Sequence, residues 1–283
     1  MTTVSVVTGA GGAMGAACTL ALAPAVDAVL LTDIDEQRLA GTVERVERDT
    51  KTEACMLAGD IGDRAFLDEL AARARTLGDL RAVVHTAGLS PAMTDWREIL
   101  RVDLAAVAAL LDAFLPAVGR GSVAVCLASI SGHMGAFDPA MDAVLDEPLA
   151  ADCEARFRAL AGDAPDSGAT YRLAKRAVIR CCERAAVAWG ARGGRVVSLS
   201  PGLIDTGMGR LELEANDIKQ WMAAITPVGG ERTGPDTVLP GLVDDIAGAV
   251  AFLCSERAAF ISGCDLRVDG GLIAAMQHQL PTT

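Results

Sequence analysis

Short β-branched runs alternate with longer stretches of helical periodicity along most of the chain. Within each short run the apolar residues are nearly continuous, which is typical of a strand buried on both faces of a parallel sheet. This alternation predicts right-handed βαβ units and a sheet that helices cover on both faces. We expect strands near residues 4–8, 28–33, 54–58, 82–86, 122–128, 195–199 and 265–268.

The longer stretches predict helices in the gaps between these strands. Seven strands suffice for a Rossmann-type doubly wound parallel sheet, so the predicted fold class is α/β. The length of 283 residues and the lack of a low-complexity linker favour a single domain over residues 1–283. The helices are expected at residues 15–22, 36–49, 64–77, 96–115, 170–191 and 243–254, with a shorter one near 212–224.

One segment breaks this alternation. About forty residues separate the fifth strand from the following helix, whereas such connections usually take only a handful. We therefore predict an insertion over residues 138–168, with part of 142–160 helical. Residues 203–240 are predicted to form a substrate lid and loop, mobile over 207–226, because loops at this edge of such sheets carry specificity.

Composition excludes several classes of partner. The formal charge of −12 and pI near 4.7 argue against a surface that binds nucleic acid or anionic membranes. Asp27 interrupts the longest apolar run, and the first basic residue is Arg38, so we expect neither a membrane span nor a signal peptide. The eight cysteines lack metal-site spacing, which predicts reduced thiols, no metal site and a cytoplasmic protein.

A glycine-rich turn follows the first predicted strand, from Thr8 to Gly15. Glycines let backbone N–H groups and a helix N-terminus approach a pyrophosphate, although a tight strand-to-helix turn alone would look the same. Asp33 follows Gly15 by eighteen residues (33 − 15), where a carboxylate accepts hydrogen bonds from the adenosine ribose and repels a 2′-phosphate. The predicted cofactor is NAD rather than NADP; the alternative for Asp33 is an ordinary helix N-cap.

The order of motifs resembles the short-chain dehydrogenase/reductase family over nearly the whole chain. Residues 8–15 are similar to its TGxxxGxG, with Ala13 at the middle glycine, and residues 85–88 are similar to its NNAG turn, with His85 and Thr86 in place of the asparagines. The resemblance implies cofactor contacts from Gly9, Gly12, Ala13, Met14, Gly15, Asp33, Asp60, Ile61, Thr86, Ala87, Gly88, Tyr171, Lys175, Pro201, Gly202, Ile204 and Thr206.

Tyr171, the only tyrosine of the chain, is followed four residues later by Lys175, so both side chains can project from one face of a helix. The resemblance implies that Tyr171 is the catalytic acid/base, that Lys175 lowers its pKa and holds the nicotinamide ribose, and that Ser129 aligns the substrate oxygen. The alternative for the pair is a packing residue and a solvated charge. Ser129 and Tyr171 are 42 residues apart (171 − 129), whereas relatives keep them on the order of a dozen apart, so the insertion lies between them.

Asp103 stands where the family has a catalytic asparagine. In the family this asparagine holds a water that relays protons to the lysine. An aspartate could still hold that water, or it could instead pair with Lys175 or raise the pKa of Tyr171. Ser131, His133 and Met208 are candidate substrate contacts, with a structural role the alternative for His133.

These features predict an NAD-dependent oxidoreductase that interconverts a secondary alcohol and a ketone. The insertion and residues 112–116 resemble the bacterial 3α-hydroxysteroid dehydrogenase/carbonyl reductase subgroup, which suggests a bulky apolar or steroid-like substrate. A catalytically silent NAD sensor on the same fold and an NADP-dependent reductase are the alternatives. The expected assembly is a homo-oligomer, a dimer rather than a tetramer.

Overall fold

The computed structural model describes residues 2–214, 217–229 and 239–278. Within these residues seven strands form one sheet in the order β3-β2-β1-β4-β5-β6-β7, and every neighbouring pair is parallel. The predicted doubly wound fold is confirmed. The strands are β1 (Thr3–Thr8), β2 (Ala28–Thr32), β3 (Glu53–Met56), β4 (Asp79–His85), β5 (Val123–Leu127), β6 (Arg195–Pro201) and β7 (Asp265–Val268).

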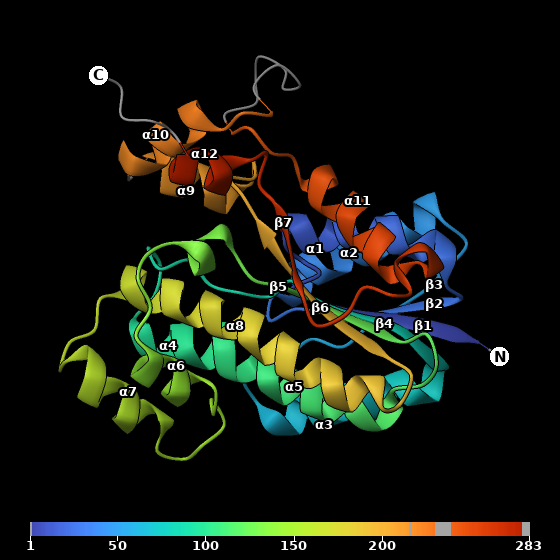
Figure 1. Cartoon of the computed structure of the whole chain (residues 1–283). Coiled ribbons are helices and arrows are strands. Elements are labelled where there is room, and N and C mark those ends of the chain that lie inside the picture. The colour runs from blue at the N-terminus through green and yellow to red at the C-terminus, as the bar shows by residue number, and fades with distance from the viewer. Residues whose placement is uncertain (1, 215–216, 230–238, 279–283) are drawn as a thin grey trace.

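Helices cover both faces of the sheet, as the continuous apolar strands require. One apolar cluster joins the sheet to α1 (Ala13–Leu22), α2 (Glu36–Asp49) and α11 (Val243–Cys254). The other face carries α3 (Arg64–Leu77), α5 (Ala106–Phe114) and α8 (Ser167–Gly190), as Figure 1 shows. The chain reverses its winding between β1 and β4, so the carboxyl ends of these two strands border a crevice where such folds bind ligands.

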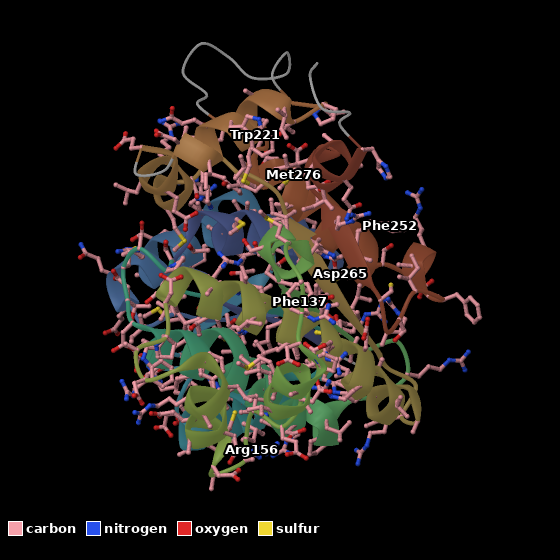
Figure 2. The ribbon with its side chains drawn as sticks, turned by 60° about the vertical axis from the view of Figure 1, so that its left-hand side comes forward. Phe137, Arg156, Trp221, Phe252, Asp265 and Met276 are labelled. Atoms are coloured by element: carbon pink, nitrogen blue, oxygen red, sulfur yellow. The ribbon has the colours of Figure 1, made fainter. Side chains whose placement is uncertain are left out.

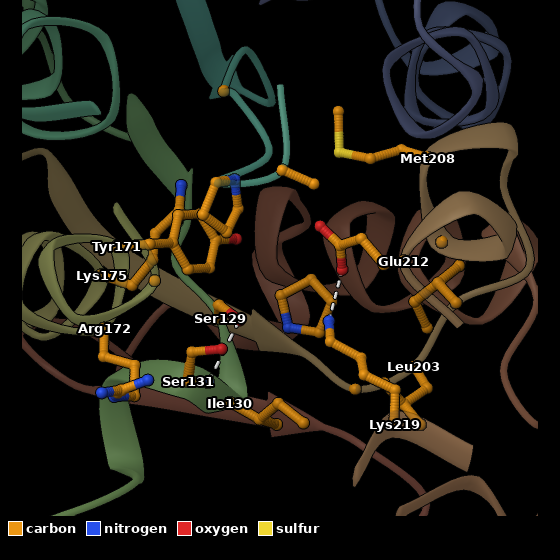
Figure 3. Close-up of a pocket in the computed structure, with 18 of the residues that line it drawn as sticks. Ser129, Ile130, Ser131, Tyr171, Arg172, Lys175, Leu203, Met208, Glu212 and Lys219 are labelled. Carbon is orange, nitrogen blue, oxygen red and sulfur yellow. Dashed lines mark hydrogen bonds and ion pairs between the residues drawn. The ribbon is translucent and has the colours of Figure 1, made fainter. Parts of the chain in front are cut away.

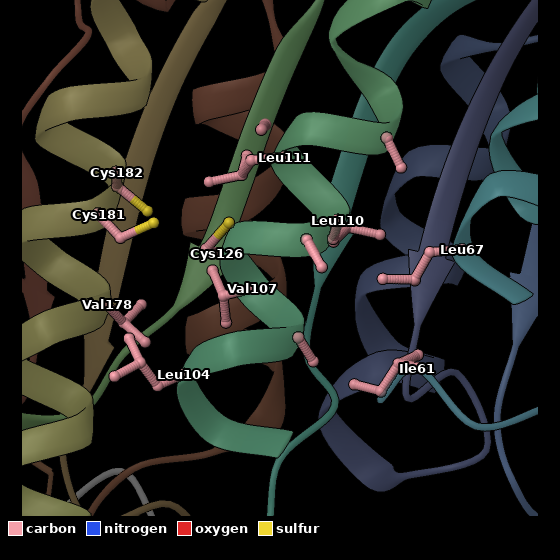
Figure 4. Packing of buried hydrophobic residues seen from close by; sticks show 14 of the residues in the cluster. Ile61, Leu67, Leu104, Val107, Leu110, Leu111, Cys126, Val178, Cys181 and Cys182 are labelled. Carbon is pink, nitrogen blue, oxygen red and sulfur yellow. The ribbon is translucent and has the colours of Figure 1, made fainter. Parts of the chain in front are cut away.

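Side chains of α5 and α8 fill the second face. Val107 and Leu111 lie beside Cys126 of β5, Leu104 lies beside Val178 of α8, and Cys181 points toward Cys126 from the same helix (Figure 4). The eight cysteines are all free. No helix in the described part of the chain is long and apolar enough to span a membrane, and the same residues contain no cluster of potential metal ligands.

The helix expected at residues 96–115 is present, but it is not α-helical throughout. It consists of α4 (Trp96–Leu100), a π-helical turn Arg101–Ala105 and α5. The turn contains Asp103, whose side chain is fully buried. Single π-helical turns often occur at functional sites, and the apolar periodicity does not reveal them because the flanking helices continue through both ends.

The insertion forms two helices, α6 (Pro139–Leu145) and α7 (Cys153–Ala161), which lie beside α4 and α8 in Figure 1. Met141, Leu145 and Phe157 are buried in the same cluster as the sheet core, and the Phe157 ring stacks on Trp96 with centroids 5.6 Å apart. The insertion is therefore an integral part of this layer rather than a free flap.

The segment after β6 also differs from expectation. Two helices, α9 (Gly207–Glu214) and α10 (Asp217–Ile225), replace the single one expected near residues 212–224, and a further helix, α12 (Leu272–His278), was not predicted. These three pack together above the carboxyl ends of the strands (Figure 1). Residues 215–216 and 230–238 of the predicted lid lie outside the described residues.

Candidate active site

A cavity of about 570 Å³ opens at the carboxyl ends of the central strands. Ser129, Tyr171, Lys175 and Asp103 all line it, and Figure 3 shows the first three beside one another. Residues from a strand end, a long helix and a π-helical turn thus meet at one site, although more than 70 residues separate the first from the last along the chain.

Tyr171 and Lys175 lie on consecutive turns of α8. Asp166 precedes this helix and caps it, because its carboxylate accepts from the Ala169 N–H. The Lys175 Nζ atom lies 5.5 Å from the centroid of the Tyr171 ring. It also lies 3.5 Å from the Leu127 carbonyl oxygen at the end of β5, to which it donates. The lysine is buried and the tyrosine is partly exposed to the cavity.

Asp103 pairs with Lys175 at 2.8 Å, and both groups are buried. The backbone N–H of Leu89 also donates to the Asp103 carboxylate, at 3.2 Å. Burial is the largest single effect and lowers the pKa of Lys175. The charges of Asp103 and Tyr171 and the hydrogen bond to Asp103 together outweigh burial, so the pKa is raised. Of the roles considered for Asp103, the structure contains the direct ion pair with Lys175, and the aspartate also raises the pKa of Tyr171.

The pKa of Tyr171 is raised above its ordinary value. Burial is the main cause; Lys175 opposes it, whereas the carboxylates of Asp103 and Glu212 add to it and a hydrogen bond from Ser129 reduces it. Without cofactor, the phenol is therefore protonated at neutral pH and can donate a hydrogen bond to a substrate oxygen.

Ser129 caps the 3₁₀ turn Ile130–His133, because its hydroxyl accepts from the Ser131 N–H at 3.1 Å. This cap points the serine side chain into the cavity beside Tyr171 (Figure 3). Ser131 and Met208 also line the cavity, as the substrate interpretation requires.

His133 does not line this cavity. Its Nε2 atom lies 2.8 Å from Asp265 and 3.2 Å from the Ser200 hydroxyl. Both partners meet the same nitrogen, so the three residues do not form a nucleophilic triad. The histidine instead connects the Ser129 turn to β6 and β7, which corresponds to the structural alternative. Figure 2 shows Asp265 on its strand.

The glycine turn leaves no room for side chains. Gly9 has φ of +66°, and a Cβ on Gly15 would lie 2.1 Å from the Gly9 carbonyl oxygen. Thr86 fastens β4 to this turn, because its hydroxyl donates to the Thr8 carbonyl at 2.7 Å. Gly12, Ala13 and Met14 complete the turn and begin α1. Such a cradle fits a dinucleotide pyrophosphate.

Asp33 follows the end of β2, and its carboxylate accepts from the backbone N–H groups of Gly11 and Asp35, each at 3.0 Å. The N-cap of α2 is Asp35, which accepts from the Arg38 N–H. The capping alternative for Asp33 therefore does not hold, and its carboxylate lies beside the glycine turn, where a ribose would sit.

The other candidate cofactor residues divide into two groups. Asp60 is paired with Arg101 at 2.9 Å, and the Ile61 side chain is buried in the core, so only its backbone is available to a ligand. Ala87 packs against Gly9. The remaining members that line the cavity are Met14, Thr86, Gly88, Pro201, Gly202, Ile204 and Thr206.

The polar residues of the cavity wall that were not predicted include Glu212 of α9 and Lys219 of α10. Ser90, in the loop after β4, donates to Glu212. Their roles depend on how the lid helices pack, and no motif marks them.

His85 was noted only as a departure from the family turn. It is buried and contacts the Thr8 hydroxyl at 2.8 Å, and burial with the charge of Lys175 lowers its pKa to about 3, so it is neutral at physiological pH.

Comparisons with known proteins identify the family of the chain. A family model described as short chain dehydrogenase matches residues 3–141, and one described as enoyl-(acyl carrier protein) reductase matches residues 159–273. The unmatched residues 142–158 between them fall within the insertion. The chain belongs to the short-chain dehydrogenase/reductase family.

Cis-4-hydroxycyclohexanecarboxylate dehydrogenase of Sinomonas cyclohexanicum is 30% identical to the chain, covering 96% of both proteins. The 3-alpha-hydroxysteroid dehydrogenase/carbonyl reductase of Comamonas testosteroni is 29% identical over 81% of this chain and 86% of that protein. A 7α-hydroxysteroid dehydrogenase crystallised with NADH and an oxo bile acid shares the fold, with a TM-score of 0.74, 22% identity and coverage of 95% and 93%. The protein is thus an oxidoreductase of alcohols and ketones that uses NAD or NADP.

Proposed function

We propose that this protein interconverts an alicyclic secondary alcohol and its ketone with NAD as cofactor. The observation that carries the proposal is the meeting of Ser129, Tyr171 and Lys175 at one cavity beside the glycine turn. The bound dinucleotide supplies the hydride acceptor for alcohol oxidation or the hydride donor for ketone reduction.

Tyr171 is the proposed proton-transfer group. During reduction its phenol donates a proton to the substrate oxygen, and during oxidation its phenolate removes the alcohol proton. The charge of Lys175 stabilises that phenolate, and the Ser129 hydroxyl orients the same substrate oxygen. Asp103 holds Lys175 in place and preserves its charge, at the cost of opposing ionisation of the tyrosine.

The preference for NAD rests on Asp33. Its carboxylate lies beside Gly11, where it can accept from both ribose hydroxyls of an adenosine but repels a 2′-phosphate. Gly9 and Gly15 would bind the pyrophosphate. Lys175 would bind the nicotinamide ribose, and Ile204 and Thr206 would face the nicotinamide carboxamide.

The substrate class is supported by the cavity wall and by two relatives. Ile130, Met134, Leu203 and Met222 contribute apolar surface to the cavity, which suits a saturated carbon ring. The names of the relatives from Sinomonas and Comamonas refer to a hydroxycyclohexane and to a hydroxysteroid. A steroid-like molecule is the bulky member of this class.

Two measurements test the proposal together. Purified protein should reduce NAD in the presence of alicyclic alcohols graded by size, and the affinity for NAD should exceed that for NADP by at least about tenfold. Asp33→Ala should reduce the ratio of the affinities for NAD and NADP. Asp35→Ala, at the N-cap of α2, should leave this ratio unchanged. Tighter binding of NADP by the unaltered protein would refute the NAD preference.

A further inference from the structure

The cavity wall opposite Tyr171 carries an ion pair. Glu212 of α9 and Lys219 of α10 are joined through their charged groups, and both line the cavity that Tyr171 and Ser129 line. In Figure 3 the pair stands on one side of the pocket and Tyr171 on the other. The two side chains are only 18% and 29% exposed, so the pair belongs to the cavity rather than to the outer surface.

Ser90 fixes the direction of this pair. Its hydroxyl donates to Glu212 Oε1 at 2.6 Å, and it accepts from the Ala92 N–H at 3.3 Å in the loop after β4. The carboxylate of Glu212 is thereby held between the lid helices and the loop that follows a core strand. The negative charge of Glu212 acts across the cavity, because it is one of the causes that raise the pKa of Tyr171.

A substrate whose reacting carbon lies at Tyr171 can extend across the cavity to Glu212 and Lys219. A hydrocarbon end would remove water from both charges and give no hydrogen bond in return. A carboxylate could accept from Lys219 but would be repelled by Glu212 beside it. A hydroxyl group both donates and accepts, so it satisfies the two side chains together.

We propose that Glu212 and Lys219 bind a second hydroxyl group of the substrate, remote from the reacting carbon, and thus select alicyclic diols and hydroxyketones. This inference rests on the proposed alcohol–ketone function. The carbon ring between the two hydroxyls lies against Ile130, Leu203 and Met222. The lid helices then determine specificity, while Ser129, Tyr171 and Lys175 carry out the reaction.

The test compares three ring alcohols with NAD as acceptor: cyclohexanol, the cyclohexane diol with hydroxyls on opposite carbons, and the ring alcohol with a carboxylate at that position. Wild-type kcat/KM should be about tenfold or more higher for the diol than for cyclohexanol. Glu212→Gln and Lys219→Met should each reduce this ratio several-fold. Glu214→Gln, an exposed position on the same helix, is the matched control and should preserve it.

Equal kcat/KM for the diol and cyclohexanol, or a preference for the carboxylate compound, would overturn the inference and leave the proposed function intact. Absence of turnover with every alcohol and every ketone would count against the proposed function instead. Calorimetry then decides the inference separately, using the diol and the NADH-loaded protein. Binding that Glu212→Gln weakens about tenfold supports it, whereas undetectable or unchanged binding overturns it.

Discussion

Asp103 faces Lys175 across 2.8 Å in a buried ion pair at the base of the cavity. The pair is packed closely, because a Cβ on Gly88 would lie 2.7 Å from the Asp103 carboxylate. A neutral amide at this position would leave the lysine charge directed only at Tyr171. The negative charge of Asp103 offsets part of the stabilisation that Lys175 gives to the Tyr171 phenolate, so the phenol ionises less readily.

Asp103→Asn should therefore lower the pKa of Tyr171 while activity is retained. The sign follows from charge: the carboxylate favours the neutral phenol, so its removal lets the phenolate form at lower pH. Tyr171 is the only tyrosine of the chain, so the near-ultraviolet absorbance of tyrosinate reports this residue alone. Asp112→Asn, an exposed position on α5, is the control. An unchanged titration, or complete loss of activity with cofactor still bound, would contradict this account.

The resemblance of the sequence to the family implied a site at Ser129, Tyr171 and Lys175, and the structure brings these three residues to one cavity. Reasoning from the sequence also found Asp103 as a departure from the family motif but left its partner open. It could not find Glu212 and Lys219, since their approach to the cavity depends on the packing of α9 and α10. His133 was ambiguous for a similar reason, because Asp265 lies 132 residues away in the chain.

At the scale of elements, the insertion is attached to the catalytic helix by ion pairs. Arg176 of α8 binds Asp142 of α6 at 2.8 Å, and its guanidinium also lies over the Phe137 ring, 4.0 Å from the centroid. Arg180 continues the contact to Asp146. The insertion therefore braces the helix that carries Tyr171.

Asp142→Asn should reduce the free energy of unfolding by about 2 kcal/mol at neutral pH. Arg176 holds the pKa of Asp142 below its ordinary value of 3.8. A depressed carboxyl pKa stabilises the fold above that ordinary value, and the contribution is lost as the pH falls through the folded-state pKa. The difference between variant and wild type should thus shrink in acid, as urea unfolding would show.

Asp163→Asn is the matched control for this measurement. Asp163 lies in the same insertion but is fully exposed, and it contacts Arg158 at 3.4 Å. An exposed pair of this kind contributes little. Equal destabilisation by the two variants, or a difference for Asp142→Asn that persists in strong acid, would show that the Arg176 ion pair does not brace α8.

The element boundaries followed closely from the apolar pattern where a strand or helix is buried along one face. α2, α3, α11 and β7 have the predicted limits. The pattern did not reveal the π-helical turn of Asp103, where the local geometry departs from a regular period, and it predicted one helix where α9 and α10 are found. The turn and both helices contribute residues to the cavity.

At the scale of the whole molecule, α6 occupies part of the surface of α8. That surface is then unavailable for pairing with a second chain, which favours a dimer over a tetramer. Exposed aromatic side chains lie elsewhere, at Phe252 on α11 and at Phe260 shortly before β7, and Figure 2 shows the former at the edge of the molecule. Such side chains are suited to an interface.

Light scattering should give a dimer mass for the wild type and a smaller mass for Phe260→Arg. Met93, which is exposed after β4, provides the control substitution Met93→Arg, and this variant should remain dimeric. A tetramer mass for the wild type, or no change for Phe260→Arg, would contradict the predicted assembly.

Tyr171 lies in the cavity with Lys175 and Ser129, and the proposed chemistry depends on it. The most direct test is the steady-state rate of NAD reduction with an alicyclic alcohol, measured for the wild type and for Tyr171→Phe, with NADH affinity measured alongside. We predict that kcat/KM falls by about 10²–10⁴-fold while NADH affinity changes little. A phenylalanine variant that retains most of the wild-type rate would contradict the assignment of Tyr171 as the acid/base.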